Sequence, residues 1–146
     1  MARPSAGQMA HTCLMVASLD KTIALYSGLL GMPVVKIVRE GPSPAPYAAL
    51  GSENDYLELF ERPSGARPPA PEAGAPIALG LSHLSVWVDD LEALVPRLAE
   101  AGYPLIRNAK VRYAPSWVGS AIKVAWIEDP DGAPVELLQY AGPAEK

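Results

Sequence analysis

The sequence predicts an α+β fold, in which two βαβββ modules pair into a curved, barrel-like mixed sheet with the helices outside. The first observation is an internal repeat: the residue types of His11–Val16 recur in the same order at His83–Val88. The second is that a helix-like pattern and three strand-like segments follow each copy. Neither module alone would cover both faces of its sheet, so we expect the modules to pair within one chain or across a dimer.

Length and composition are typical of one globular domain spanning residues 1–146, because 49% of the residues are hydrophobic and 19% are charged. The formal net charge is −4 and no cluster of Lys or Arg offsets it, so we expect no nucleic-acid or membrane partner. No apolar run approaches the length of a membrane span. Cys13 is the only cysteine and residues 1–8 lack the apolar core of a signal peptide, which predicts a cytoplasmic protein.

The first module is expected at about residues 9–61. Its opening strand ends before Ser18, a residue type that is favoured at helix N-caps. The helix that follows places Ile23, Tyr26 and Leu30 on one face, and Gly31 supplies a left-handed stop. Three strand segments come next, at Val34–Val38, Tyr47–Leu50 and Tyr56–Phe60.

The second module, at about residues 81–141, repeats this plan after a linker rich in proline, glycine and alanine at about residues 62–80. Asp90 is the expected helix N-cap and Gly102 the stop. The buried face of the helix is predicted to comprise Leu91, Leu94, Val95 and Leu98. The strands are predicted at Leu105–Asn108, Ala121–Ile127 and Val135–Tyr140, the last two joined by a turn at Asp129–Gly132.

Two histidines and two glutamates are the candidate metal ligands. Because side chains alternate along a strand, His11 and its counterpart His83 point away from the apolar face that a helix covers. Glu58 and Glu136 lie between apolar residues in the last strand of each module, where an unpaired charge would cost on the order of several kcal/mol. If the repeat brings the four together, they predict a site for one divalent ion of Ni, Co, Fe, Mn or Zn, with positions left for a small molecule with vicinal oxygens.

Further side chains are expected to line a substrate pocket beside these ligands. Cys13 shares the face of His11, and we expect it to fill space rather than act as a nucleophile, because the sequence shows no setting that would stabilise a thiolate. Aromatic side chains are expected to form the apolar walls. The candidate pocket residues are Cys13, Tyr56, Trp87, Tyr113 and Trp117.

Several segments of the two modules have a pattern seen in a known family: His11–Leu19, Leu29–Met32, Tyr56–Phe60, Ser82–Asp90, Glu128–Gly132 and Val135–Leu138. On these segments the chain resembles the vicinal oxygen chelate superfamily, which includes glyoxalase I, methylmalonyl-CoA epimerase, extradiol dioxygenases and the bleomycin resistance proteins. The resemblance implies that His11, Glu58, His83 and Glu136 are the metal ligands and that the protein is a homodimer. A set of four ligands is similar to the isomerase and epimerase side of the superfamily.

The resemblance implies a divalent-metal-dependent lyase, isomerase or epimerase that abstracts a proton next to a metal-chelated carbonyl. Glu136 is the implied base, and Glu58 is the alternative base or the acid on the opposite face. A second interpretation is an extradiol-type Fe(II) dioxygenase, for which four protein ligands leave few open positions. A third is a metal-free protein that binds an antibiotic or another metabolite, and the metal content of the purified protein separates it from the other two.

Overall fold

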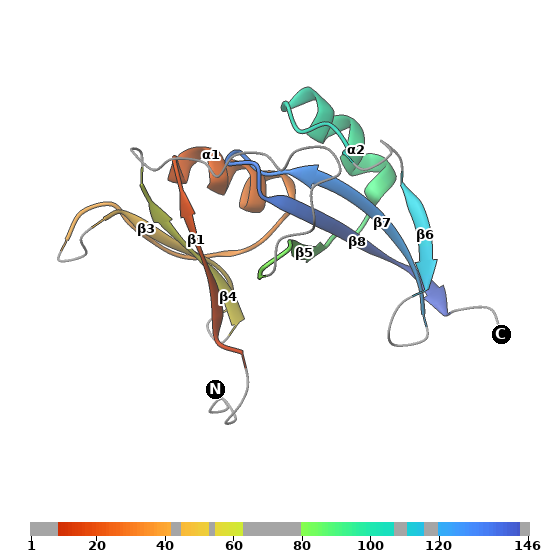
Figure 1. Cartoon of the computed structure of the whole chain (residues 1–146), viewed down its shortest axis with the longest axis horizontal. Coiled ribbons are helices and arrows are strands. Elements are labelled where there is room, and N and C mark those ends of the chain that lie inside the picture. The colour runs from red at the N-terminus through yellow and green to blue at the C-terminus, as the bar shows by residue number, and fades with distance from the viewer. Residues whose placement is uncertain are drawn as a thin grey trace. The chain divides into compact units, whose positions relative to one another are not determined.

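The computed structural model divides the chain into two compact units, Met1–Ala66 and Arg67–Lys146. In each unit the described residues form a four-stranded mixed sheet and a helix (Figure 1). The α+β class and the repeated order of elements are therefore confirmed. The described residues are 9–41, 45–52, 55–62, 80–106, 111–115 and 120–143.

The first unit runs from strand β1 (His11–Val16) through a helix into three further strands. The helix starts as α1 (Leu19–Ile23) and continues as the π-helix η1 (Ala24–Leu29). The sheet order is β1-β4-β3-β2, in which β1 is parallel to β4 and the other pairs are antiparallel. Its remaining strands are β2 (Val34–Val38), β3 (Tyr47–Ser52) and β4 (Asp55–Glu61).

The second unit repeats this topology. Strand β5 (Leu84–Trp87) leads into helix α2 (Leu91–Glu100). The sheet order is β5-β8-β7-β6, again with the first and last strands parallel and the other pairs antiparallel. The remaining strands are β6 (Arg112–Pro115), β7 (Ser120–Glu128) and β8 (Pro134–Pro143). In both units the first and last strands are thus neighbours, which places their side chains within reach of one another.

The first helix differs from the predicted one in its second half. The N–H of Leu30 donates to the carbonyl of Leu25 at 3.0 Å, five residues back, which makes a wider turn than that of an α-helix. Leu25 and the adjacent Tyr26 are both fully buried, whereas Ile23, predicted on the buried face, is half-buried. The wider turn buries two consecutive side chains, which a regular helical period does not predict.

The start of each helix is tied to the last strand of its unit. Ser18 and Asp90 are the predicted N-caps, and each accepts a hydrogen bond from the backbone N–H three residues further on. In addition, the N–H of Leu19 donates to Oε2 of Glu61 in β4 at 2.8 Å. The side-chain oxygen of Gln139 in β8 takes the same place at the start of α2, at 2.9 Å. These bonds fix the helices against the strands that carry the two glutamates.

The prediction of a strand at Leu105–Asn108 is wrong for residues 105–106, which belong to no strand. Residues 107–108 lie outside the described residues. The N–H of Ile106 donates to the carbonyl of Trp126 at 2.8 Å. The strand that pairs with β7 is instead β6. Pro104, next to the predicted strand, has no N–H to donate to a strand ladder. This gives a physical reason why the strand that pairs with β7 begins later in the chain, at Arg112.

The predicted linker at about residues 62–80 lies outside the described residues except for Arg62 and Gly80 at its two ends. The predicted stops at Gly31 and Gly102 are confirmed, with φ angles of 81° and 90°. Within the described part of the chain, no helix combines the length and the apolar character needed to cross a bilayer.

Gly51 in β3 occupies a position that only glycine fits. Its φ is +125°, and an added Cβ would lie 2.8 Å from the carbonyl oxygen of Asp55. We expect Gly51→Ala to lower the free energy of unfolding by about 2–3 kcal/mol, which lowers Tm by about 5–10 °C. Gly28→Ala in η1 is the matched control, because no atom lies within 4 Å of an added Cβ there. Equal Tm shifts in the two variants would contradict this prediction.

Candidate functional site

The two candidate glutamates lie on the sheet faces opposite the buried cores of their units. Leu57 and Leu59, on either side of Glu58, are buried at 6% and 0% exposure. The neighbours of Glu136 in β8 are fully buried as well. The side chains of Glu58 and Glu136 keep 22% and 20% of their surface exposed. The predicted alternation is confirmed, and it holds each carboxylate on the open face of its own sheet.

In the first unit, strands β1 and β4 run side by side (Figure 1), and His11 of β1 faces Glu58 of β4. The Nε2 atom of His11 lies 3.7 Å from Oε2 of Glu58. The register places His11 opposite Tyr56, and the two rings stack with centroids 5.0 Å apart and planes at 18°. The stack restricts the imidazole plane while Nε2 faces the carboxylate.

The second unit repeats this arrangement with His83 and Glu136. His83 immediately precedes β5, and its Nε2 lies 3.6 Å from Oε2 of Glu136 in the neighbouring strand β8. An aromatic ring again borders the imidazole: Trp126 of β7 meets His83 edge to face, with centroids 4.8 Å apart. The two units therefore present His–Glu pairs of the same geometry from equivalent strands.

Two serines hydrogen-bond to the pair of the second unit. Ser85 lies opposite Glu136 in the register of β5 and β8, and its hydroxyl donates to Oε2 at 2.6 Å. The hydroxyl of Ser82 lies 3.1 Å from Nδ1 of His83. A partner on Nδ1 fixes the orientation of the ring and leaves Nε2 as the nitrogen that faces Glu136.

Cys13 lies opposite Glu58 in the register of β1 and β4. It is exposed in its unit, so the expectation that it is a small buried filler is wrong. Partial burial of the sulfur and the neighbouring Glu58 carboxylate raise the pKa of the Cys13 thiol. The thiol therefore stays protonated at neutral pH, which agrees with its not being a nucleophile.

The predicted pocket residues have different outcomes. Tyr56 contacts His11 directly through the stacked rings. Trp87 is 59% exposed in β5, two residues after Ser85 and hence on the same face. Tyr113 belongs to β6, and Trp117 lies outside the described residues. The structure thus brings Cys13 and Tyr56 against candidate ligands and places Trp87 on the ligand-bearing face of its unit.

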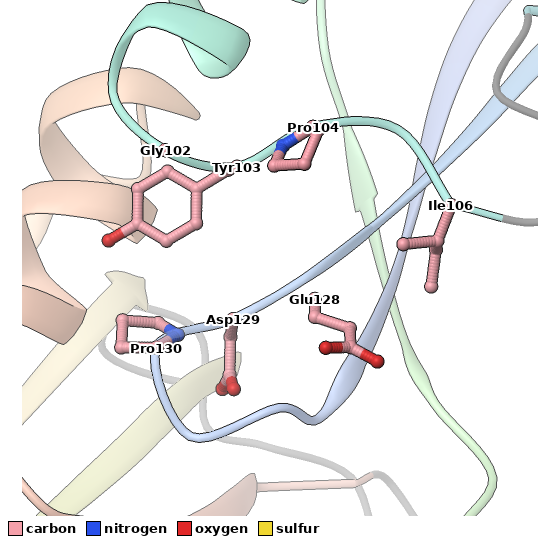
Figure 2. A pocket seen from close by; sticks show the side chains of 7 residues that line it. All are labelled: Gly102, Tyr103, Pro104, Ile106, Glu128, Asp129 and Pro130. Atoms are coloured by element: carbon pink, nitrogen blue, oxygen red, sulfur yellow. The ribbon is translucent and has the colours of Figure 1, made fainter.

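A cavity of about 220 Å³ lies elsewhere in the second unit (Figure 2). It lies between the chain that follows α2 and the turn that joins β7 to β8, and neither His83 nor Glu136 lines it. Asp129 in this turn is buried, and its Oδ1 accepts backbone hydrogen bonds at 2.8 and 2.9 Å, which closes the predicted turn. The lining residues are Gly102, Tyr103, Pro104, Ile106, Glu128, Asp129 and Pro130.

Each His–Glu pair offers one imidazole nitrogen and one carboxylate oxygen, which are donor types that bind divalent metals. Imidazole nitrogen and carboxylate oxygen suit Fe, Co, Ni or Zn. Two ligands at about 2.1 Å from a metal lie about 3.0–3.4 Å apart at octahedral or tetrahedral angles, and the two observed separations of 3.7 and 3.6 Å are slightly wider. Among the described residues, no group of three or more His, Cys, Asp or Glu side chains meets the geometry of a metal site. Each unit taken alone therefore presents two candidate ligands.

Local sequence patterns gave no role to Ser82 or Ser85, although both contact a candidate ligand. Trp126 borders His83, as expected of an aromatic residue in a pocket wall. Alternation alone places Ser85 on the face of His83, two residues further on. Its contact with Glu136 depends on the parallel register of β5 and β8, which no local sequence pattern reveals.

Comparisons with known proteins place this geometry in a wider context. Residues 8–137 match the family model described as the Glyoxalase/Bleomycin resistance protein/Dioxygenase superfamily. The chain is 29% identical over 136 residues to a protein of Neisseria meningitidis serogroup A named lactoylglutathione lyase, with 90% of each chain covered.

Two solved structures are also similar to this chain. A glyoxalase family protein from Enterococcus faecalis is 26% identical, with a TM-score of 0.63 over 92% of this chain and 98% of that one. The trypanothione-dependent glyoxalase I of Leishmania major is 25% identical, with a TM-score of 0.63 over 92% of this chain and 87% of that one.

Proposed function

The chain belongs to the Glyoxalase/Bleomycin resistance protein/Dioxygenase superfamily, and we propose that it is a divalent-metal-dependent lyase of the glyoxalase I type. Its substrate would be the hemithioacetal of a 2-oxoaldehyde and a thiol, and its product the thioester of a 2-hydroxy acid. Relatives named for lactoylglutathione and for trypanothione support a thiol conjugate as the substrate class. The single cysteine is consistent with a reducing, cytoplasmic location.

The observation that carries this proposal is the repeated His–Glu pair, with N···O separations of 3.7 and 3.6 Å. We propose that the pairs complete each other in one site held by His11, Glu58, His83 and Glu136, within a chain or across a homodimer. Four nitrogen and oxygen ligands around Ni, Co, Fe, Mn or Zn leave positions for the two neighbouring oxygens of the substrate. When bound, the metal supplies Lewis-acid polarisation of these oxygens.

The chemistry that falls to the chain is a proton transfer between adjacent carbons. The Glu136 carboxylate would take the proton from the carbon that bears sulfur, and the electron pair of that C–H bond shifts toward the neighbouring carbonyl. Returning the proton to the former carbonyl carbon, while the hydroxyl proton passes between the two oxygens, gives the thioester without any oxidant. Glu58 would be the alternative base or the acid on the opposite face. Ser85 supports the assignment to Glu136, because its hydroxyl orients that carboxylate.

Side chains around the pairs would position the imidazole and the substrate. Tyr56 restricts the His11 ring by stacking, and Trp126 borders His83. Trp87 offers an exposed indole on the face of Ser85, where it would form an apolar wall for the substrate.

An assay of thioester formation tests the proposed reaction. The full-length protein, stripped with a chelator and reloaded with Ni²⁺, Co²⁺ or Zn²⁺, is mixed with methylglyoxal and glutathione. We expect thioester to accumulate with at least one metal and to stop when chelator is added again. A second mixture that contains a small thiol in place of glutathione tests how much the thiol part contributes. If no mixture produces thioester with any of these metals, the proposed reaction is wrong.

A further inference from the structure

The two His–Glu pairs share a geometry but differ in the groups around them. The repeat that aligns His83 with His11 also aligns Ser85 with Cys13. In the second unit a hydroxyl donates to Oε2 of Glu136 at 2.6 Å, a short bond of the kind that ionised acceptors make. In the first unit the equivalent group on the neighbouring strand is a thiol, which is a weak donor.

The imidazoles differ in the same way. The repeat aligns Ser82 with Ala10, so a hydroxyl precedes His83 where a methyl group precedes His11. The Ser82 hydroxyl is 3.1 Å from Nδ1 of His83 and so selects which ring nitrogen faces the carboxylate. His11 is restricted by its stack on Tyr56, which limits the plane of the ring but does not select between its nitrogens.

We propose that Ser82 and Ser85 are positioning residues that preorganise His83 and Glu136 as the anchored half of the metal site, while His11 and Glu58 form the half that adapts. This inference rests on the proposed metal-dependent function and refines it. A ligand already held in its bound orientation loses less freedom when the metal binds. Partners behind metal ligands typically contribute about 10–100-fold in metal affinity.

The affinity of the protein for metal reports this difference between the two His–Glu pairs, and its measurement does not depend on catalytic turnover. Co²⁺ alone is titrated into the metal-free, full-length protein in competition with a chromophoric chelator. We expect Ser85→Ala to weaken Co²⁺ binding by about 10–100-fold and Ser82→Ala to weaken it by about 10-fold. Cys13→Ala makes the comparison at the equivalent strand position beside Glu58, and it should weaken Co²⁺ binding by no more than about twofold, because a thiol is a weak donor. Ser85→Thr, which keeps a hydroxyl, should retain the wild-type affinity.

Ser85 is exposed, so the serine variants are expected to fold, and thermal unfolding of the metal-free proteins checks that they do. If Ser85→Ala does not fold, Ser85→Cys makes the same test by installing the residue of the first unit. Equal affinity losses for Ser85→Ala and Cys13→Ala, or no loss for Ser85→Ala, would overturn the inference. Absence of thioester formation together with a serine-specific affinity loss would overturn the proposed reaction and leave this inference standing.

Discussion

Replacing Glu136 with glutamine is expected to lower kcat by about 10³-fold while KM changes little, because the amide keeps the shape of the side chain but cannot accept a proton from carbon. Glu136 extends from β8 with one oxygen 3.6 Å from His83 and hydrogen-bonded to Ser85. The measurement is thioester formation at saturating metal, with metal content determined in parallel so that lost affinity is not mistaken for a lost base.

Two other variants make this experiment decisive. Glu100→Gln, at the exposed end of α2, is the matched control and should retain full turnover. Glu58→Gln tests the alternative base. If Glu136→Gln keeps wild-type turnover while Glu58→Gln loses it, the two carboxylates have exchanged roles. If both variants stay active, proton transfer by these carboxylates is wrong.

Replacing either candidate histidine with alanine is also expected to lower turnover strongly. His11→Ala and His83→Ala should each lower turnover more than about 100-fold at limiting metal, since a lost ligand costs at least as much as a lost partner behind one. The two rings lie in different units and have nearly equal distances to their glutamates. Similar losses in both variants would therefore indicate one shared site. Full turnover in either variant would exclude that histidine as a ligand.

Much of the fold could be predicted because it depends on local patterns. Alternation in β4 and β8 placed Glu58 and Glu136 opposite the buried core, and the capping residue types marked where both helices begin. The π-turn at Leu25 could not be predicted, because it depends on burying two consecutive apolar side chains. The misplaced strand at Leu105–Asn108 shows a similar limit, since the choice of segment that pairs with β7 depends on tertiary contacts.

For the candidate site, too, some residues could be predicted from the sequence and others could not. The repeat identified the two histidines and two glutamates, because each module carries the same residue types on the same face. The groups that orient them did not follow from local patterns, because Ser85 meets Glu136 and Cys13 meets Glu58 only through the parallel registers of the outer strand pairs. Sequence periodicity gives the face of a residue but not its cross-strand neighbour.

We propose that the two His–Glu pairs form one metal site, and the number of metal ions bound per chain distinguishes this arrangement from two separate sites. Co²⁺ titrated into the metal-free, full-length wild type should saturate at one tightly bound ion per chain, and His11→Ala should abolish tight binding altogether. Two ions per chain in the wild type, falling to one in His11→Ala, would show that each His–Glu pair binds its own metal, and this result would contradict the shared site.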